Sequence, residues 1–393
     1  MKHISLRRLA AVIIGIVFLI AGLIKLSDPV GAGLKVAEYF KFFHLRALLP
    51  AARAAGITLA LLESSLGVAL ITGVLRKFTA WATTALLGFF TLVTLTLWIF
   101  NPSMDCGCFG EAVHLSHAKS FWKNVVLLVL AGLSFFPFGD FGKTPRRKIV
   151  SACIAVTSLV LATIYANTHL PLVDFTDFHL GSELFASLED DLAADNHYLE
   201  SRVYEKDGKQ GRFYPGYYPS DMSWKLVQTD TVFWKGPLSS DTFPILSFRN
   251  AEDVYLDRMA AEGQVMVFSV YDPAKAPWER LQRQFHAVEE AGALPLLLVA
   301  CAPSQVDDYA IPYDLTVYYA DYKTLIALNR DNGGCTYFYE GELIEKWLSR
   351  DFPKDLPGIL AADPVNLSTY RITRHRLTAQ GFCLYLAALL ALV

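Results

Sequence analysis

Two cysteines, Cys106 and Cys108, stand one residue apart in the segment NPSMDCGCFGEAVHLSHAKS, residues 101–120. A Cys-Gly-Cys pair can close a small disulfide ring, with a Cα separation near the upper end of what a disulfide tolerates. Gly107 lets the backbone take unusual φ values at such a tight turn. Because a strained, exposed disulfide is easily reduced, it would be oxidising toward other thiols. Thiol–disulfide exchange is therefore the first chemistry that this segment predicts.

Two other interpretations of the same segment stay open. In one, the cysteines are reduced packing residues in a short loop. In the other they bind a metal together with two imidazoles, because thiolate and imidazole ligands suit zinc or copper. The spacing C-x-C-x5-H-x2-H is not a standard structural zinc pattern. The four ligands of that alternative are Cys106, Cys108, His114 and His117.

Long apolar runs lie on both sides of the cysteines. Of the 393 residues, 53% are hydrophobic and 19% are charged, below the roughly 25% charged residues of ordinary soluble domains. A net charge of −3 gives no reason to expect a nucleic-acid partner. Five runs are long enough to span a bilayer, and a sixth is either a last span or a surface helix. The five cover residues 9–24, 54–75, 79–100, 121–138 and 149–166, and the sixth covers 381–393.

Polar residues inside these runs are candidates for function. Glu63 lies within the second run and Lys25 at the end of the first. Carboxylates in a membrane are costly and are often functional. We expect either a Glu63–Lys25 ion pair that joins two helices or a role for Glu63 in proton or quinone chemistry. Asn124, in the fourth run, is expected to form a hydrogen bond between helices.

The positive charges predict the orientation. Basic residues gather at the N-terminus and in two connections that fall on the same side, which the positive-inside rule assigns to the cytoplasm. The first outward connection also carries basic residues, but fewer than the three inward segments carry together. The cysteines and a large C-terminal domain would then face the periplasm of a bacterium, where disulfides persist. The basic residues that this rule places on the cytoplasmic side are Lys2, Arg7, Arg8, Arg76, Lys77, Lys143, Arg146, Arg147 and Lys148.

Two motifs carry a family resemblance over about residues 5–140. GLIKLSDP ends the first run, and DCGCFG follows the third. This part of the chain resembles the DoxX-like superfamily of four-helix membrane proteins, and most of all its methylamine-utilisation MauE family. The resemblance implies a redox-associated membrane protein, linked in the MauE case to disulfide formation in an exported partner. Together with the location it implies quinone as an electron acceptor, but it does not imply methylamine use.

The C-terminal half has a different pattern. VMVFSVY and LPLLLVA are continuous apolar strands on either side of an amphipathic helix, an order typical of a parallel pair. A strand, a helix and a hairpin turning at Glu340-Gly341 follow. Residues 243–352 resemble the thioredoxin-like fold of periplasmic redoxin domains. The first strand leads to no cysteine, and Cys335 stands where that family has a cis-proline, so the usual dithiol chemistry cannot run here.

Cys335 is either a small buried strand residue or a lone thiol that exchanges with the Cys-Gly-Cys pair. The remaining cysteines are expected to be inert. They are Cys153, Cys301 and Cys383.

The sequence therefore predicts an all-α membrane four-helix bundle with a fifth helix, joined to a soluble α/β thioredoxin-like domain. We expect thiol–disulfide exchange, or support for it, with an exported thiol protein or a periplasmic redox protein as partner. The alternative is a non-enzymatic scaffold in the bilayer that binds a partner. The predicted parts are the four-helix transmembrane domain at 1–140, a cytoplasmic loop and fifth helix at 141–170, an aromatic-rich extension with a hairpin at 171–242, the thioredoxin-like domain at 243–352, a linker at 353–380 and the last apolar run at 381–393.

Overall fold

The chain folds into two compact units in a computed structural model. The first unit combines Met1–Phe175 with His375–Val393, and the second is Thr176–Arg374. The structure describes residues 6–102, 104, 106–113, 115–136, 144–184, 196–206, 209–213, 224–235 and 245–391.

The first unit is helical. Among the described residues, five helical segments are long and apolar enough to cross a membrane, which confirms the five predicted runs. One of these segments, Arg46–Thr72, begins with a short 3-10 helix, η1 (Arg46–Ala51). The helices are α1 (Leu6–Ser27), α2 (Pro29–Phe42), α3 (Ala52–Thr72), α4 (Arg76–Phe100), α5 (His117–Phe135) and α6 (Arg146–Thr168).

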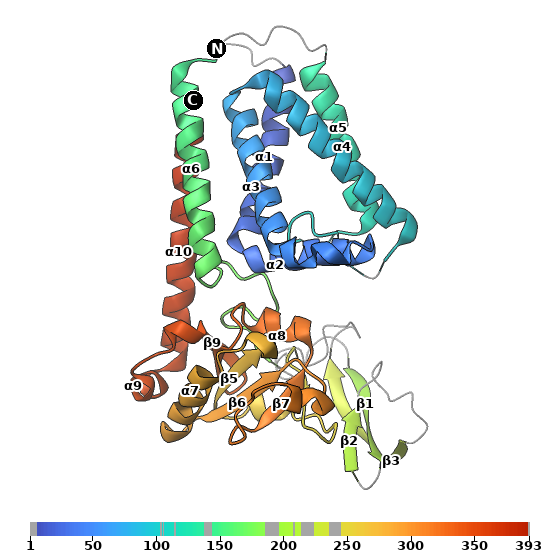
Figure 1. Cartoon of the computed structure of the whole chain (residues 1–393), viewed down its shortest axis with the longest axis vertical. Coiled ribbons are helices and arrows are strands. Elements are labelled where there is room, and N and C mark those ends of the chain that lie inside the picture. The colour runs from blue at the N-terminus through green and yellow to red at the C-terminus, as the bar shows by residue number, and fades with distance from the viewer. Residues whose placement is uncertain are drawn as a thin grey trace. The chain divides into compact units, whose positions relative to one another are not determined.

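Helices α1 and α3 pack side by side (Figure 1). Glycines make this close approach possible. A Cβ atom added to Gly22 would lie 2.1 Å from Ser64 Oγ, and one added to Gly67 would lie 2.6 Å from the Leu19 amide nitrogen. The two helices therefore meet almost backbone to backbone, which fixes the positions of the polar residues that they carry.

Helix α2 lies where the sequence predicted only an outward connection. The Asp28 side chain caps its N-terminus by accepting a hydrogen bond from the Gly31 amide at 3.0 Å, and Pro29 occupies its first turn. A Cβ atom on Gly56 of α3 would lie 2.8 Å from the Ala32 carbonyl oxygen, so α2 packs tightly on α3. Its charged residues interrupt the apolar pattern, which is why hydropathy alone did not predict it.

The C-terminal residues form one helix, α10 (Pro364–Ala391). The boundary that the sequence placed between a linker and a last apolar run, at residue 380, falls inside this helix. Its final turns pack on α6, where Ser151 Oγ donates to the Leu389 carbonyl at 2.8 Å and Ser158 Oγ lies 3.1 Å from the Tyr385 hydroxyl. The last apolar run is thus held against a predicted span.

The second unit contains a mixed six-stranded sheet in the order β4-β7-β6-β5-β8-β9. Strands β5, β6 and β7 are parallel, and the other three pair antiparallel. The predicted parallel pair and the hairpin at Glu340-Gly341 are confirmed. The strands are β4 (Phe248–Arg249), β5 (Gln264–Val270), β6 (Leu294–Val299), β7 (Val317–Ala320), β8 (Gly334–Tyr339) and β9 (Glu342–Trp347).

Helices cover both faces of this sheet. Alternate residues of β5 enter two separate hydrophobic clusters, as the two-residue period of a strand requires. Helix α7 (Trp278–Glu290) contributes Leu281 and Phe285 to one cluster, and α8 (Tyr322–Leu328) contributes Leu325 to the other. The domain is therefore a mixed α/β sheet with two covered faces, and the thioredoxin-like assignment stays a prediction.

A separate three-stranded sheet in the order β2-β1-β3 lies in the predicted aromatic-rich extension. Strand β1 (Asn196–Lys206) pairs antiparallel with β2 (Lys209–Phe213) and with β3 (Lys225–Lys235). The predicted hairpin is confirmed by the pairing of Lys206 with Lys209. Its predicted Asp207-Gly208 turn lies outside the described residues.

Candidate functional site

The two cysteines lie on the loop that joins α4 to α5, which we call the cysteine loop (residues 101–116). Their sulfur atoms are 3.7 Å apart, close enough to share a proton. Gly107 between them has a φ of 59°, a conformation that favours glycine. A Cβ atom there would also lie 3.2 Å from Lys35 Cγ of α2. The glycine thus lets the chain turn sharply beneath α2 and brings both sulfurs to one place.

The two thiols have different environments. Cys106 is 1% exposed, whereas Cys108 is half-buried. A hydrogen bond from the Cys106 thiol lowers the pKa of Cys108, and the positive charges of Lys123 and Lys25 lower it further. The same interaction, together with burial, raises the pKa of Cys106. Cys108 is therefore the sulfur that favours the thiolate and that a reactant can approach.

Tyr39 of α2 holds the loop from the other side. Its hydroxyl donates a hydrogen bond to the backbone carbonyl of Cys106. Burial raises the pKa of the phenol well above its usual value, and the neighbouring charges of Cys106 and Cys108 add to this effect. The phenol stays protonated and remains a donor. Its hydrogen bond therefore fixes Cys106 through the backbone carbonyl of that residue.

Charged side chains from three helices surround the sulfurs. Lys25 Nζ of α1 lies 2.7 Å from Glu63 Oε2 of α3, and both side chains are buried. The predicted ion pair is thus present and ties α1 to α3. Lys123 Nζ of α5 lies 4.8 Å from the ring centre of Phe109, the residue after Cys108. The structure therefore brings Lys25, Glu63 and the cysteines into a single site.

Neutral polar groups complete the surroundings. Asn124 Nδ2 donates to Thr94 Oγ1 at 3.3 Å, the predicted hydrogen bond between helices. The hydroxyl of Ser120, one turn earlier on α5, is fully buried beside the sulfurs and lowers the pKa of both thiols. A hydroxyl in this place can stabilise negative charge on either sulfur as it develops.

The proposed metal ligands are only partly described. His114 lies outside the described residues. His117 Nε2 is 3.2 Å from the Pro102 carbonyl oxygen at the base of the loop. Within the described part of the chain, no three histidine, cysteine, aspartate or glutamate side chains gather as metal ligands would. The contacts of His117 thus connect the two ends of the loop.

The comparison with known families agrees with the cysteine loop and the helices around it. Residues 4–137 match the family described as methylamine utilisation protein MauE. The chain is a multi-pass membrane protein. No curated protein and no solved structure matches it. We refer to residues 4–137 as the MauE-like region; it contains every residue of the site described above.

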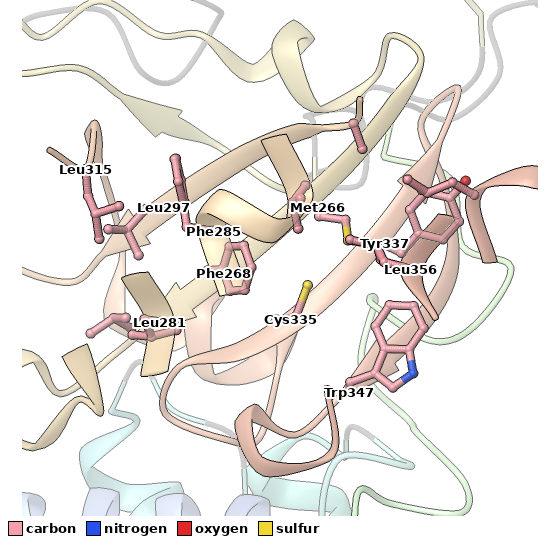
Figure 2. Close-up of a cluster of buried hydrophobic side chains, with 14 of the residues drawn as sticks. Met266, Phe268, Leu281, Phe285, Leu297, Leu315, Cys335, Tyr337, Trp347 and Leu356 are labelled. Carbon is pink, nitrogen blue, oxygen red and sulfur yellow. The ribbon is translucent and has the colours of Figure 1, made fainter. Parts of the chain in front are cut away.

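Cys335 is not part of that site. It lies outside the MauE-like region, on β8, and its side chain is fully buried in the core among Phe268, Tyr337 and other apolar residues (Figure 2). Burial raises the pKa of its thiol far above the usual range. Of the two interpretations of Cys335, the geometry supports the packing residue. A protonated, enclosed thiol is neither a nucleophile nor accessible to one.

The other cysteines show no comparable environment. Cys301 at the end of β6 has a pKa raised by burial. Cys153 and Cys383 lie exposed on α6 and α10, outside the MauE-like region. None of the three has a cysteine partner in the described part of the chain.

Sequence reasoning missed Lys123, Ser120 and Tyr39. Lys123 could have been found, because a lysine in the first turns of a predicted span is costly unless it has a partner. Ser120 and Tyr39 carry no such signal. A serine at the start of a helix is ordinary, and Tyr39 belongs to a helix that the hydropathy pattern did not predict.

Proposed function

We propose that this protein is a membrane thiol–disulfide oxidoreductase whose Cys106–Cys108 pair oxidises thiols of exported proteins. The observation that carries the proposal is the pairing of unlike thiols 3.7 Å apart, one buried and one half-buried with a lowered pKa. This asymmetry is what a dithiol needs for exchange. One sulfur forms the mixed disulfide with the partner, and the other leaves and takes a proton as that bond forms.

The proposed reaction balances as two exchange steps. A partner thiolate attacks Cys108 Sγ of the disulfide, and the electron pair of the broken S–S bond passes to Cys106 Sγ, which takes a proton. A second partner thiolate then attacks the partner sulfur of the mixed disulfide and releases Cys108 as a thiolate. The partner gains a disulfide and the Cys106–Cys108 pair gains two electrons. A stable Cys108 thiolate favours this direction, because it stabilises the reduced form.

The pair must then lose two electrons and its proton to an acceptor. We propose a lipid-soluble quinone as the chemical class of that acceptor; it becomes the quinol by taking the two electrons, the Cys106 proton and one proton from water. The support for it is the position of the cysteine loop at the ends of apolar helices, where groups dissolved in the bilayer can arrive.

We further propose that the protein lies in the bacterial inner membrane with its cysteine loop and second unit outside. The basic residues at one set of helix ends support this orientation. The second unit would recruit the partner instead of reacting with it. Three parallel strands followed by an antiparallel hairpin support a thioredoxin-like origin, yet no cysteine lies between β5 and α7.

Trapping of mixed disulfides in intact cells tests the proposal. Cells are quenched with acid and labelled with a heavy maleimide, with and without prior reduction. Wild type is compared with Cys106→Ser, Cys108→Ser and, as a matched control, Cys335→Ser. In Cys106→Ser the Cys108 thiolate can still attack a partner disulfide, and no neighbouring thiol is left to displace the partner again, so this variant is expected to accumulate a reducible adduct with another protein.

The other two variants are expected to show no such adduct. If both thiols of wild type are fully labelled without reduction and Cys106→Ser forms no adduct, the exchange function is wrong.

A further inference from the structure

The two residues that follow Cys108 in the cysteine loop lie beside two lysines. Phe109 follows Cys108 directly, and the Lys123 ammonium lies over its ring at 4.8 Å. Gly110 comes next, and a Cβ atom there would lie 3.9 Å from Lys25 Cγ. The residues that directly follow Cys108 therefore lie beside a lysine of α5 and a lysine of α1, and both charges act on the Cys108 thiol.

The two lysines differ in how their charge is balanced. Lys25 forms its 2.7 Å ion pair with Glu63, so this pair contributes no net charge to the site. Lys123 has no carboxylate within ion-pair distance among the described residues; its nearest described partner is the face of Phe109. A cation over an aromatic ring keeps its full positive charge. The unbalanced charge beside Cys108 is therefore that of Lys123.

The other titratable groups around Cys108 do not neutralise the charge of Lys123. Cys106 holds its own proton and Tyr39 stays a neutral phenol. Lys35, which lies over Gly107, has Glu38 at 3.8 Å. Ser120 is uncharged. Among these described groups, Lys123 is the cation that remains opposite a sulfur that is negative only when the cysteine pair is reduced.

We propose that Lys123 is the positioning residue that stabilises the Cys108 thiolate, so that the charges of the buried site balance only in the reduced protein. Oxidation of the pair to a disulfide removes the negative sulfur and leaves the Lys123 charge unbalanced in a partly buried place. Such a charge is costly. The disulfide is therefore a stronger oxidant with Lys123 than without it. This inference rests on the proposed exchange function and deepens it by naming the residue that sets its direction.

The reactivity of Cys108 in the reduced protein tests the proposal without requiring a partner. Full-length protein in detergent is reduced and alkylated with iodoacetamide over a series of pH values, and modification of Cys108 is measured by mass spectrometry. Lys123→Gln is expected to move the midpoint of the profile up by about one pH unit. At a pH below both midpoints, the variant would then carry roughly tenfold less Cys108 thiolate than wild type. Lys123→Arg should keep the midpoint near that of wild type.

A matched control is Lys119→Gln, one helical turn earlier on α5, where the side chain is exposed. It is expected to leave the midpoint unchanged. If Lys123→Gln does not fold, Phe109→Leu carries the test, because it removes the ring that seats the ammonium and should shift the midpoint in the same direction. An unshifted profile in the folded variants, or an equal shift in Lys123→Arg, would overturn the proposal.

A second measurement separates this inference from the exchange function itself. The ratio of reduced to oxidised Cys106–Cys108 is measured against glutathione buffers in wild type and Lys123→Gln. Loss of the charge should make the disulfide roughly tenfold harder to reduce. A lowered ratio with no mixed disulfide in cells would support the role of Lys123 and reject the exchange function. An unchanged ratio beside a trapped partner would reject the role of Lys123 alone.

Discussion

The neighbours of Cys106 and Cys108, and not their sequence, make them different. Both are cysteines beside Gly107, yet Cys106 is buried and bonded through its carbonyl to Tyr39, whereas the charge of Lys123 lowers the pKa of Cys108. In a symmetric dithiol either sulfur could form the mixed disulfide with a partner. Here the buried Cys106 sulfur leaves and takes a proton, and the Cys108 sulfur carries the mixed disulfide, so packing decides which sulfur the partner is bonded to.

Asp257, a partly buried carboxylate in the second unit, gives a pH dependence. Asp257 accepts hydrogen bonds from the Phe248 amide at 2.9 Å and from Ser247 Oγ at 3.2 Å. Burial nevertheless raises its pKa from 3.8 to about 6. The folded state thus binds this proton more tightly than the unfolded state does. The resulting stabilisation is present in full below pH 3.8 and is lost as the pH rises through about 6.

Asp257→Asn is expected to remove this dependence. A shift of about two pKa units corresponds to at most about 3 kcal/mol in the free energy of unfolding. Hydrogen exchange at the Phe248 amide in the full-length protein, measured between about pH 4 and pH 7, would report it. After correction for intrinsic exchange, protection should fall with pH in wild type and in Asp308→Asn, an exposed control. Equal slopes in wild type and Asp257→Asn would contradict the assignment.

At the scale of elements, the site depends on how closely α1 approaches α3. Lys25 and Glu63 can meet at 2.7 Å because the glycines of these helices remove side chains from the contact. Gly22 is three residues before Lys25, almost one turn along the same face of α1. The spacing of the helices at Gly22 therefore sets the length of the ion pair that lies beside Cys108.

Gly22→Ala tests this dependence. The new methyl group would meet Ser64 Oγ and the Ala60 carbonyl, and the overpacking should cost about 1–3 kcal/mol. Gly132→Ala on α5 is the matched control, because nothing described lies within 4 Å of its added Cβ atom. It should be neutral or stabilising by up to about 1 kcal/mol. Thermal unfolding in detergent compares them, and equal melting temperatures would show that the helices can move apart freely.

At the scale of the whole molecule, much of the architecture could be predicted from the sequence. Hydropathy predicted the five spans because a bilayer demands long apolar helices whatever their partners. The apolar strands β5 and β6 were equally clear, since strands covered on both faces have no polar alternation. Helix α2 was missed because its charges and Pro29 obscure the pattern, and α10 because its first half is polar.

The candidate site was predicted only in part, because some of its residues come together only through the packing of helices. A motif reveals residues that are close in sequence, such as Cys106 and Cys108. The contact between Lys25 and Glu63 could be guessed, because two costly groups in one membrane stabilise each other. Lys123 comes to Cys108 from another helix, and only the packing of α4 and α5 around the cysteine loop sets that approach.

The orientation of the chain is the prediction that belongs to the molecule as a whole. If the basic helix ends face the cytoplasm, the second unit must lie outside. Tyr313 is fully exposed on the second unit, and Lys77 is exposed at the start of α4. A membrane-impermeant maleimide added to intact spheroplasts should label Tyr313→Cys well above the unsubstituted protein. Lys77→Cys should be labelled only after the membrane is permeabilised. The reverse pattern would place the cysteine loop inside, where reducing thiols would keep Cys106 and Cys108 reduced, and the proposed oxidation of exported partners could not operate.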